Sequence, residues 1–533
     1  MKRKTLLACS GAGLAGLVLA FGAFTNASID ALPQVPEATP QSTPVGLAAN
    51  LTDWSLQKLE LPQTADSFFR TKVVLDGNEY TLSLSPYTMR SPDFHLYVVG
   101  EDGVQVEVAP PPPTTMRGFL DELPHSVVAA SLENGKLSAM IDMGDGAPTW
   151  FIQPLSDYET GLTTEDHVTY MGSAAIAPAD AQCGNDILFP QKSNSPGPGQ
   201  PRSGIQGTGK KGNVGGGGSS SAAAADETAA IAYDADFEWF QLKGGSVSNA
   251  VAGIENIMNG VETIYQRDVG ICYTIANGII RASSNDPYSG DIQNRLGQFQ
   301  AEWNANNGAI GRDMAHFFSG LGGGGVIGVA FLGVVCTKSQ AYGASKVGFT
   351  SNLSMRIGLV AHESGHNWNA GHCNSGNCNN TCNDCRIMCA CINSCCGDVT
   401  KFGATSVNQI TNFKNSRGCL NNGCGGTFFI LHTPLEPGVA PADNTWFVTG
   451  ATPGATVEIF WGKKPGTTAA PGCAGVNLDL KKAKSLGTSV ADQHGNATVT
   501  LFVPAKASGR TLQFQALDRG VCKTSAPKAM SFN

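Results

Sequence analysis

Three histidines and one glutamate lie within a stretch of eleven residues, at spacings that suit a single metal ion. The stretch reads His362-Glu363-Ser364-Gly365-His366-Asn367-Trp368-Asn369-Ala370-Gly371-His372. On a helix, residues i and i+4 share a face, so His362 and His366 can present imidazole nitrogens to one ion. Glu363 lies beside them but off the ligand direction, from where its carboxylate can reach a water molecule on that ion.

The third histidine, His372, reaches the same ion only if the chain leaves the helix and turns back sharply. Such a turn needs a left-handed backbone near position 369, and Asn369 is the residue type best suited to it after glycine. Three neutral histidines leave one position on Zn²⁺ open for water, and Glu363 can take the proton of that water. The residues therefore predict one catalytic Zn²⁺ and the hydrolysis of peptide bonds.

The motif resembles that of the metzincins, HExxHxxGxxH, with Asn369 where the family usually has glycine. The resemblance implies a catalytic domain with a twisted mixed sheet and an active-site helix. It also implies a methionine turn beneath the metal. Arg386-Ile387-Met388-Cys389 fits that turn, with Met388 as the methionine. An ordinary core methionine is the alternative interpretation.

Further stretches are similar to the adamalysin branch of the metzincins (reprolysin or ADAM-type, peptidase family M12B). Residues 325–336 resemble the edge strand that binds substrate by β-addition, which would place Gly328, Val329 and Ala330 against the substrate. Residues 312–320 resemble the preceding segment, and residues 407–420 resemble the C-terminal helix. By this likeness Cys419 would pair with Cys336. Cys373 departs from the aspartate that these proteases carry after the third histidine.

The likeness extends upstream to an ADAM-type pro-domain. The stretches that carry it are 117–118, 124–132, 150–155 and 167–170. In that family a pro-domain cysteine ligates the zinc and blocks the water, and Cys183-Gly184 lies in the matching place. A thiolate is an excellent zinc ligand, so the resemblance predicts a latent zymogen held by Cys183. A thiol of no consequence, unpaired or intermolecular, is the alternative.

Cysteine usage indicates an oxidising compartment. Of the 16 cysteines, Cys9 would leave with an export signal, and all the others except Cys183 make an even set of 14. Eight of them fall between Cys373 and Cys396, where disulfides are favoured over a second zinc site. The adamalysin likeness also allows a Ca²⁺ ion, for which Cys419 and Asn422 have compatible spacing.

The elements that must position these residues follow from hydrophobic periodicity. An amphipathic helix is expected over 247–266 and an active-site helix over 353–368, with strands at 228–234, 269–275 and 326–335. Strand patterns separated by turn residues precede and follow this part. They include 72–75, 80–84, 94–99, 427–432, 445–449, 456–461, 497–503 and 511–517.

The chain is therefore expected to be a multidomain protein with five segments. These are a signal peptide (1–27), a β-rich pro-domain (28–192), a Gly/Ser/Pro-rich linker (193–227), a metzincin zinc protease domain (228–424) and a C-terminal Ig-like β-sandwich (425–533) that Cys473 and Cys522 could pin. A membrane anchor is the alternative to the signal peptide. No other segment is long and apolar enough to span a bilayer.

The sequence thus predicts a secreted zinc-dependent metalloendopeptidase acting on proteins or peptides, at an extracellular, cell-surface or periplasmic location. Charged residues make up only 15% and the net charge is −8, which argues against a nucleic-acid partner. The C-terminal segment could serve as a cell-surface or matrix anchor. The alternative functions are a surface adhesion protein with an inactive protease domain and an amidase of cell-wall peptides.

Overall fold

A computed structural model describes residues 45–144, 146–159, 165–185, 227–372, 386–392, 399–422, 430–432, 438–452, 454–491, 495, 497–525 and 527–533. The signal peptide, almost all of the linker and six of the clustered cysteines predicted above lie outside the described residues. Below, the N-terminal region means residues 45–185, the central region residues 227–422 and the C-terminal region residues 430–533. Among the described residues, no helix combines the length and apolar character needed to cross a bilayer.

The N-terminal region is dominated by an antiparallel sheet of eight strands, in the order β1-β10-β9-β8-β7-β6-β3-β2. Its two edges meet, because the Gln57 side chain of β1 bonds to both the N–H and the carbonyl of Val74 in β2. Aliphatic side chains such as Leu82, Val128 and Ile141 fill the space that this curled sheet encloses. The elements are α1 (Val45–Asn50), β1 (Ser55–Lys58), β2 (Phe69–Leu75), β3 (Asn78–Pro86), β6 (Thr115–Leu120), β7 (Leu123–Glu133), β8 (Lys136–Asp142), β9 (Thr149–Pro154) and β10 (Asp166–Met171).

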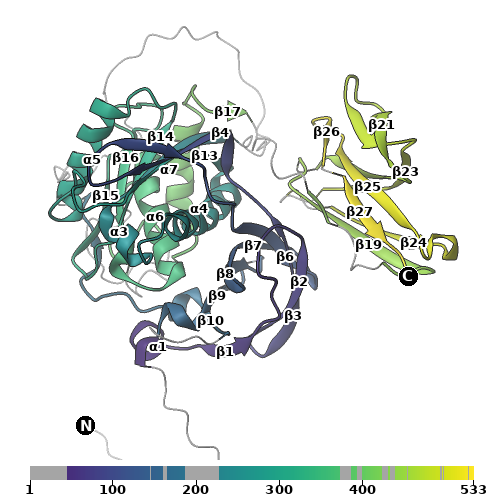
Figure 1. Cartoon of the computed structure of the whole chain (residues 1–533), viewed down its shortest axis with the longest axis horizontal. Helices are drawn as coiled ribbons and strands as arrows, with labels where there is room; N and C mark the ends of the chain where they lie inside the picture. The colour runs from purple at the N-terminus through teal and green to yellow at the C-terminus, as the bar shows by residue number, and fades with distance from the viewer. Residues whose placement is uncertain are drawn as a thin grey trace, which may run out of the picture. The chain divides into compact units, whose positions relative to one another are not determined.

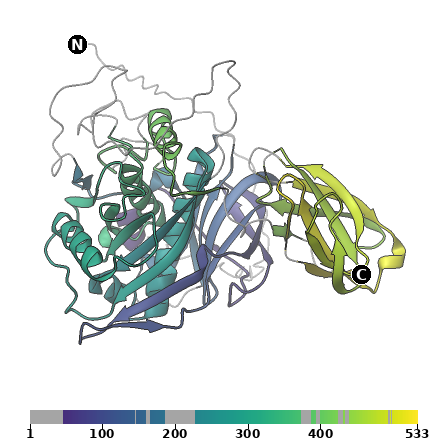
Figure 2. The same ribbon diagram turned by 90° about the horizontal axis from the view of Figure 1, so that it is seen from above.

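A second sheet of nine strands joins the N-terminal and central regions, in the order β11-β15-β16-β14-β12-β13-β4-β5, with β17 paired to β12. Figures 1 and 2 show β4, drawn in purple, along the teal strand β13, and the two strands pair in parallel. Strand β15 is antiparallel to β16. The strands are β4 (Arg90–Val99), β5 (Gln105–Val108), β11 (Gln182–Cys183), β12 (Glu227–Ala235), β13 (Ile271–Arg281), β14 (Met314–Ser319), β15 (Val326–Ala330), β16 (Tyr342–Lys346) and β17 (Asn421–Asn422).

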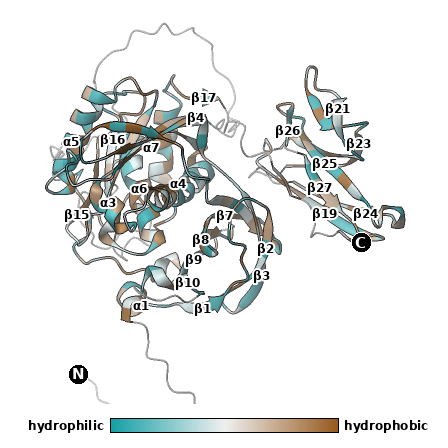
Figure 3. Ribbon diagram, viewed as in Figure 1, coloured by the Kyte–Doolittle hydropathy of each residue, from teal (hydrophilic) through white to brown (hydrophobic). Residues whose placement is uncertain are grey.

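Five α-helices of the described residues belong to the central region. They are α3 (Phe237–Leu242), α4 (Val247–Val269), α5 (Ile292–Asn306), α6 (Leu353–Asn367) and α7 (Ala404–Lys414). Helix α4 begins where Ser246 accepts a hydrogen bond from the N–H of Asn249 and ends at Gly270, whose φ of +61° suits glycine. Hydrophobic residues, brown in Figure 3, recur along α4 and α6, and both helices are largely buried in one core. The sheet and this core hold α6 in place.

Buried charge pairs cross from the N-terminal to the central region. Arg90 pairs with Glu255 of α4 at 2.7 Å, and Arg117 pairs with Glu262 of α4 at 2.9 Å. Arg267, also on α4, lies 2.5 Å from Asp142. Each pair removes two charges from water. Loss of either partner would leave a buried charge unpaired and would destabilise the contact between the N-terminal and central regions.

The C-terminal region consists of short strands around its own cores, one of which contains Trp446 and Phe514. The predicted pair Cys473–Cys522 forms a disulfide. The three sheets contain β18 (Ile430–His432), β19 (Ala442–Thr449) and β24 (Ala497–Val503), then β20 (Thr456–Gly462), β23 (Lys484–Val490), β25 (Thr511–Asp518), β26 (Lys523–Thr524) and β27 (Lys528–Ser531), then β21 (Pro465–Ala469) and β22 (Asn477–Leu480).

Most predicted elements of the central region are confirmed, but three have wrong bounds. The strand expected over 269–275 is β13, which begins only at Ile271 because α4 runs to Val269 and ends at the cap residue Gly270. The strand expected over 326–335 ends at Ala330, because the chain then turns so that Gly333 and Val334 donate to the carbonyls of His366 and Asn367. The helix expected over 407–420 is α7, which starts and stops earlier. Its C-cap is Asn415, and the chain continues through turns to Cys419.

Candidate metal centre

Helix α6 places three of the predicted residues on its buried side. His362, Glu363 and His366 are 4%, 0% and 1% exposed. Every residue of the helix except Arg356 is buried, and the helix lies against α4, β15 and β16, so these polar side chains are shielded from solvent. Burial of three titratable groups on one helix costs free energy, so their presence there indicates a functional role.

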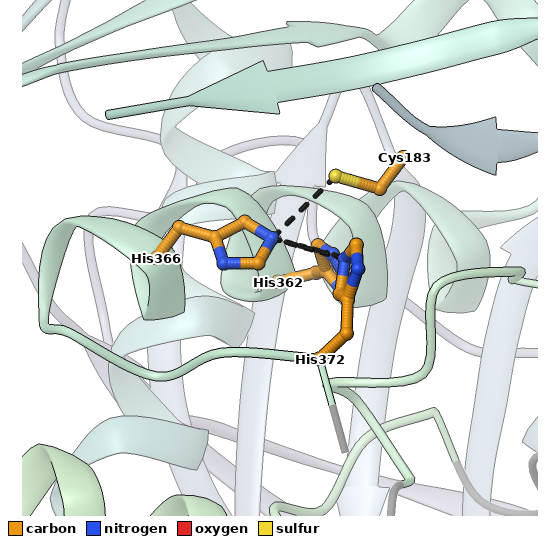
Figure 4. A group of neighbouring side chains, drawn as sticks. All are labelled: Cys183, His362, His366 and His372. Carbon is orange, nitrogen blue, oxygen red and sulfur yellow. Dashed lines mark hydrogen bonds between the residues drawn. The ribbon is translucent and has the colours of Figure 1, made fainter. Parts of the chain in front are cut away.

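The turn after α6 brings His372 back toward the helix. Asn369 adopts a φ of +70°, which confirms the left-handed backbone predicted at this position. The N–H of Asn369 donates to the carbonyl of His366, and the N–H of Ala370 donates to the carbonyl of Gly365. As Figure 4 shows, the three imidazoles then converge. Their Nε2 atoms lie 3.1 Å (His362–His366) and 3.2 Å (both pairs with His372) apart.

Backbone carbonyls orient two of these rings. His362 Nδ1 lies 2.6 Å from the carbonyl oxygen of Ile387, and His366 Nδ1 lies 2.8 Å from that of Ala370. A proton on each Nδ1 leaves the Nε2 lone pair directed to the shared centre, which is the usual arrangement of a metal-ligating histidine. Burial and the neighbouring His362 and His372 hold the pKa of His366 well below its ordinary value, so its ring is neutral. Three imidazoles whose Nε2 atoms converge fit a Zn²⁺ ion.

Glu363 lies next to this centre but does not join it. Burial raises the pKa of its carboxyl well above the ordinary value. Its Oε1 atom is buried and has no hydrogen-bond donor among the described residues. A Cβ at Gly328 of β15 would collide with this oxygen, so the carboxylate fits only because the strand has glycine there. The carboxylate therefore has an unused acceptor beside the three histidines.

Met388 lies beneath the helix, as the methionine-turn interpretation requires. Its side chain is fully buried, and its Sδ would be 2.6 Å from a Cβ at Gly365, between the two helical histidines. The turn itself is closed by a hydrogen bond from the N–H of Cys389 to the carbonyl of Arg386. The same turn supplies the Ile387 carbonyl that orients His362.

Cys183 of the N-terminal region reaches the same centre. Its Sγ lies 3.5 Å from His366 Nε2 and 3.7 Å from Glu363 Oε2. Cys183, His362, His366 and His372 offer four ligand atoms that all lie within 4.8 Å of one another. Figure 4 shows the thiol above the three rings, on the side opposite His372. The structure thus brings the predicted switch cysteine and the three histidines together.

The strand β15 carries Gly328, Val329 and Ala330, and the Cys183 segment lies along it. Gln182 and Cys183 pair in parallel with β15. The side chain of Asn185 then donates to the carbonyl of Ala330 and accepts from its N–H, both at 2.9 Å. The other side of the segment is held by a hydrogen bond from the N–H of Cys183 to the carbonyl of Ala390. Residues 182–185 therefore occupy the free side of β15.

Sequence reasoning missed Asn185 and the two orienting carbonyls. A lone asparagine has no local signature, and carbonyls carry no sequence information.

The predicted disulfide Cys336–Cys419 forms, and Cys272, Cys389 and Cys391 are also disulfide-bonded. The second group of candidate ligands among the described residues, Asp313 with Cys336 and Cys419, contains that disulfide. Nothing in the described residues supports the Ca²⁺ ion.

A comparison with protein families matches the part of the chain that carries this site. Residues 221–415 match the family model Reprolysin_5, described as metallo-peptidase family M12. No curated protein matches the chain. Among solved structures, metalloproteinase-II from Bacteroides fragilis aligns at 13% identity and a TM-score of 0.34, covering 66% of this chain and 92% of that one. A chaperone–substrate complex aligns at 11% identity and a TM-score of 0.25, covering 67% and 56%.

The family match covers the strands and helices that position the three histidines. The two structural alignments are too weak to bear on function. The match over residues 221–415 and the converging histidines together support a metallopeptidase domain of the M12 family.

Proposed function

We propose that this protein is a secreted zinc-dependent metalloendopeptidase, made as a latent precursor. The observation that carries the proposal is the set of three Nε2 atoms within 3.2 Å of one another, beside a buried glutamate. M12 metallopeptidases typically depend on zinc, and His362, His366 and His372 would hold that ion. The substrates are proteins or peptides.

The residues divide the chemistry between them. When bound, zinc supplies Lewis acidity to a water molecule and to the carbonyl oxygen of the scissile peptide. Glu363 accepts a proton from the attacking water and passes it to the leaving amine. Its place beside the three histidines suits this role, because its buried Oε1 atom has no hydrogen-bond donor among the described residues. Gly328, Val329 and Ala330 would pair with the substrate backbone.

Latency is proposed to come from the N-terminal region, acting as an ADAM-type pro-domain. Its Cys183 thiolate would take the fourth position on the metal, and residues 182–185 would keep substrate from β15. Cleavage within the linker 193–227 would begin activation. The C-terminal region would be an Ig-like module that attaches the mature enzyme to a surface or matrix. Export through the signal peptide 1–27 would place the enzyme outside the cytoplasm.

The alternative, an adhesion protein with an inactive protease domain, has less support. An inactive domain has no need to keep three converging histidines with a buried glutamate beside them, and all four residues are present. No observation on the described residues favours adhesion specifically.

The deciding experiment measures cleavage of casein, an unstructured protein, by a purified fragment of residues 228–533 loaded with zinc. Parallel samples contain a zinc chelator or carry Glu363→Ala. We expect cleavage that both controls abolish, while Glu363→Ala keeps its zinc because the glutamate is not a ligand. A fragment that unfolds cooperatively and holds one zinc per chain, yet leaves casein intact, would overturn the proposal.

A further inference from the structure

The N-terminus of the metal-binding helix lacks the cap that its own sequence provides. Asn352 precedes α6 and has the extended backbone of an N-cap residue, with φ −68° and ψ 120°, but its side chain caps nothing. Asparagine is among the best N-cap residues, because its side-chain oxygen can accept from the second or third N–H of the helix. Those N–H groups belong to Ser354 and Met355. The unused cap therefore calls for an explanation.

The N-terminal region occupies this side chain. Asn352 Nδ2 donates to the carbonyl of Asn50 at 2.9 Å, and Asn352 Oδ1 lies 2.9 Å from the hydroxyl of Tyr158, which also lies 2.8 Å from Gln153 Oε1. The side chain is fully buried by these contacts. Asn352 is thus a docking residue for the N-terminal region, and this use excludes its use as a cap.

The N-terminal region supplies a cap in exchange. Gln153 Oε1 accepts from the N–H of Leu353, the first residue of α6, at 2.8 Å. The hydroxyl of Tyr170 lies 3.5 Å from the next N–H, that of Ser354, and itself donates to Gln153 Oε1 at 2.6 Å. Gln153 Nε2 donates to the carbonyl of Ser351. The helix that holds His362 and His366 therefore starts on hydrogen bonds from outside the central region.

We infer that Asn352 is a positioning residue with two alternative sets of hydrogen bonds. In the uncut chain it binds Asn50 and Tyr158 while Gln153 caps α6. When the N-terminal region leaves, Gln153 leaves with it, and the Asn352 side chain rotates to cap α6 itself. The backbone of Asn352 is already in the N-cap conformation, so only side-chain torsions change. This exchange keeps the first turn of α6 intact in the mature enzyme, two to three turns before His362.

The inference rests on the proposed function in one respect, the separation of the N-terminal region during activation. It predicts that the requirements on residue 352 differ between the released central region and the uncut chain. In the released central region, residue 352 should follow the N-cap preference, in which Asp and Ser serve as well as Asn and Ala does not. In the uncut chain, residue 352 must donate to Asn50 and accept from Tyr158, which Asp cannot do.

The test uses the full chain with a specific protease site inserted near residue 210, cut after folding. Size-exclusion chromatography over a dilution series gives the Kd of the cut N-terminal fragment, and thermal unfolding gives the Tm of the central region after separation. We expect Asn352→Asp to raise that Kd by at least about tenfold, because it buries a carboxylate against the carbonyl of Asn50, to which it cannot donate. The released central region should keep the wild-type Tm in this variant.

Asn352→Ala should lower the Tm of the released central region by about 2–4 °C, the effect of one lost cap. Asn352→Ser should leave the Tm of the released central region at the wild-type value. The matched control is Asp291→Ala, which removes the side-chain cap of α5, a helix whose cap comes from the central region itself. That variant should lower the Tm of the central region after separation while leaving the Kd unchanged.

The inference is overturned if Asp and Ala lower the released Tm equally, since residue 352 would then not act as a cap. A fragment that stays bound in every variant also overturns it, because the second set of hydrogen bonds would never form. Neither readout involves peptide cleavage, so an inactive enzyme would count against the proposed function and not against this exchange.

Discussion

At the scale of single residues, the site depends on small residues at close approaches. Gly328 leaves the space that Glu363 Oε1 occupies, Gly365 leaves the space for the Met388 sulfur, and Asn369 takes the left-handed turn that returns His372. None of these three residues would touch the metal. They decide whether the groups that do so, and the base beside them, can converge.

Gly328→Ala should displace Glu363 without disturbing the metal ligands. The added Cβ collides with the carboxylate, and a shift of about 1 Å in a catalytic group can lower kcat by about 100-fold. Zinc content should stay at the wild-type value, since the three histidines are untouched. Casein cleavage and zinc content measured on the same samples check this. Gly322→Ala is the control, because a Cβ there meets only one atom, at an ordinary 3.8 Å. Equal losses in the two variants would contradict the steric argument.

Cys183→Ala should make the uncut chain cleave casein. The thiolate is the proposed fourth ligand, and alanine leaves that position to water. The measurement is casein cleavage by the full-length variant, with intact full-length wild type as the reference. Continued latency would mean that the pairing of residues 182–185 with β15 blocks the cleft without help from the thiol. Asn185→Ala, which removes both hydrogen bonds to Ala330, would then distinguish the two contributions.

At the scale of elements, the sequence predicts what periodicity and local motifs encode. The helical spacing of apolar residues over 247–266 predicts α4, and HExxH within 353–368 predicts both α6 and its role. The sequence could not predict that β4 would pair with β13. Both read as strands, but the pattern within a strand does not specify a partner that lies about 180 residues away. The hydrogen bond that Gln153 provides to the first residue of α6 could not be predicted for the same reason, because nothing in the sequence links Gln153 to Leu353.

Arg117→Ala should destabilise the full chain far more than the loss of a surface charge. It leaves the carboxylate of Glu262, which is fully buried, with Tyr87 as its remaining side-chain partner among the described residues. Breaking a buried pair in this way costs about 3–5 kcal/mol. Urea unfolding followed by fluorescence measures the change. Lys72→Ala is the control, since its pair with Glu79 is mostly exposed and is worth about 0–1 kcal/mol. Similar values for the two variants would show that the interface does not depend on this pair.

At the scale of the whole molecule, the proposed metal centre is also a cross-link. His362 and His366 come from α6, His372 from the turn after it and Cys183 from the N-terminal region. A ligand that binds only the folded state stabilises it by about 4 kcal/mol at a concentration of 1,000 Kd. The centre should therefore contribute to the stability of the uncut chain as well as to its latency.

Removal of zinc with a chelator should lower the Tm of the uncut chain, and added zinc should restore it. Calorimetry before and after treatment with 1,10-phenanthroline measures both changes. Glu363→Ala should show the same response, because that side chain is not a ligand. A Tm that does not respond to the chelator in a chain shown to contain zinc would contradict a structural contribution from the centre.

The nine-stranded sheet has a consequence for how the chain acquires its fold. Its strands come from positions as far apart as Arg90 and Asn422, and most neighbours are not consecutive in sequence. Sheets built from such distant pairings fold slowly, because chain entropy is lost before the contacts form. Strands β4 and β5 are synthesised long before β13. We expect the N-terminal region to fold first around its own curled sheet. Strand β4 would then already be formed when β13 pairs with it.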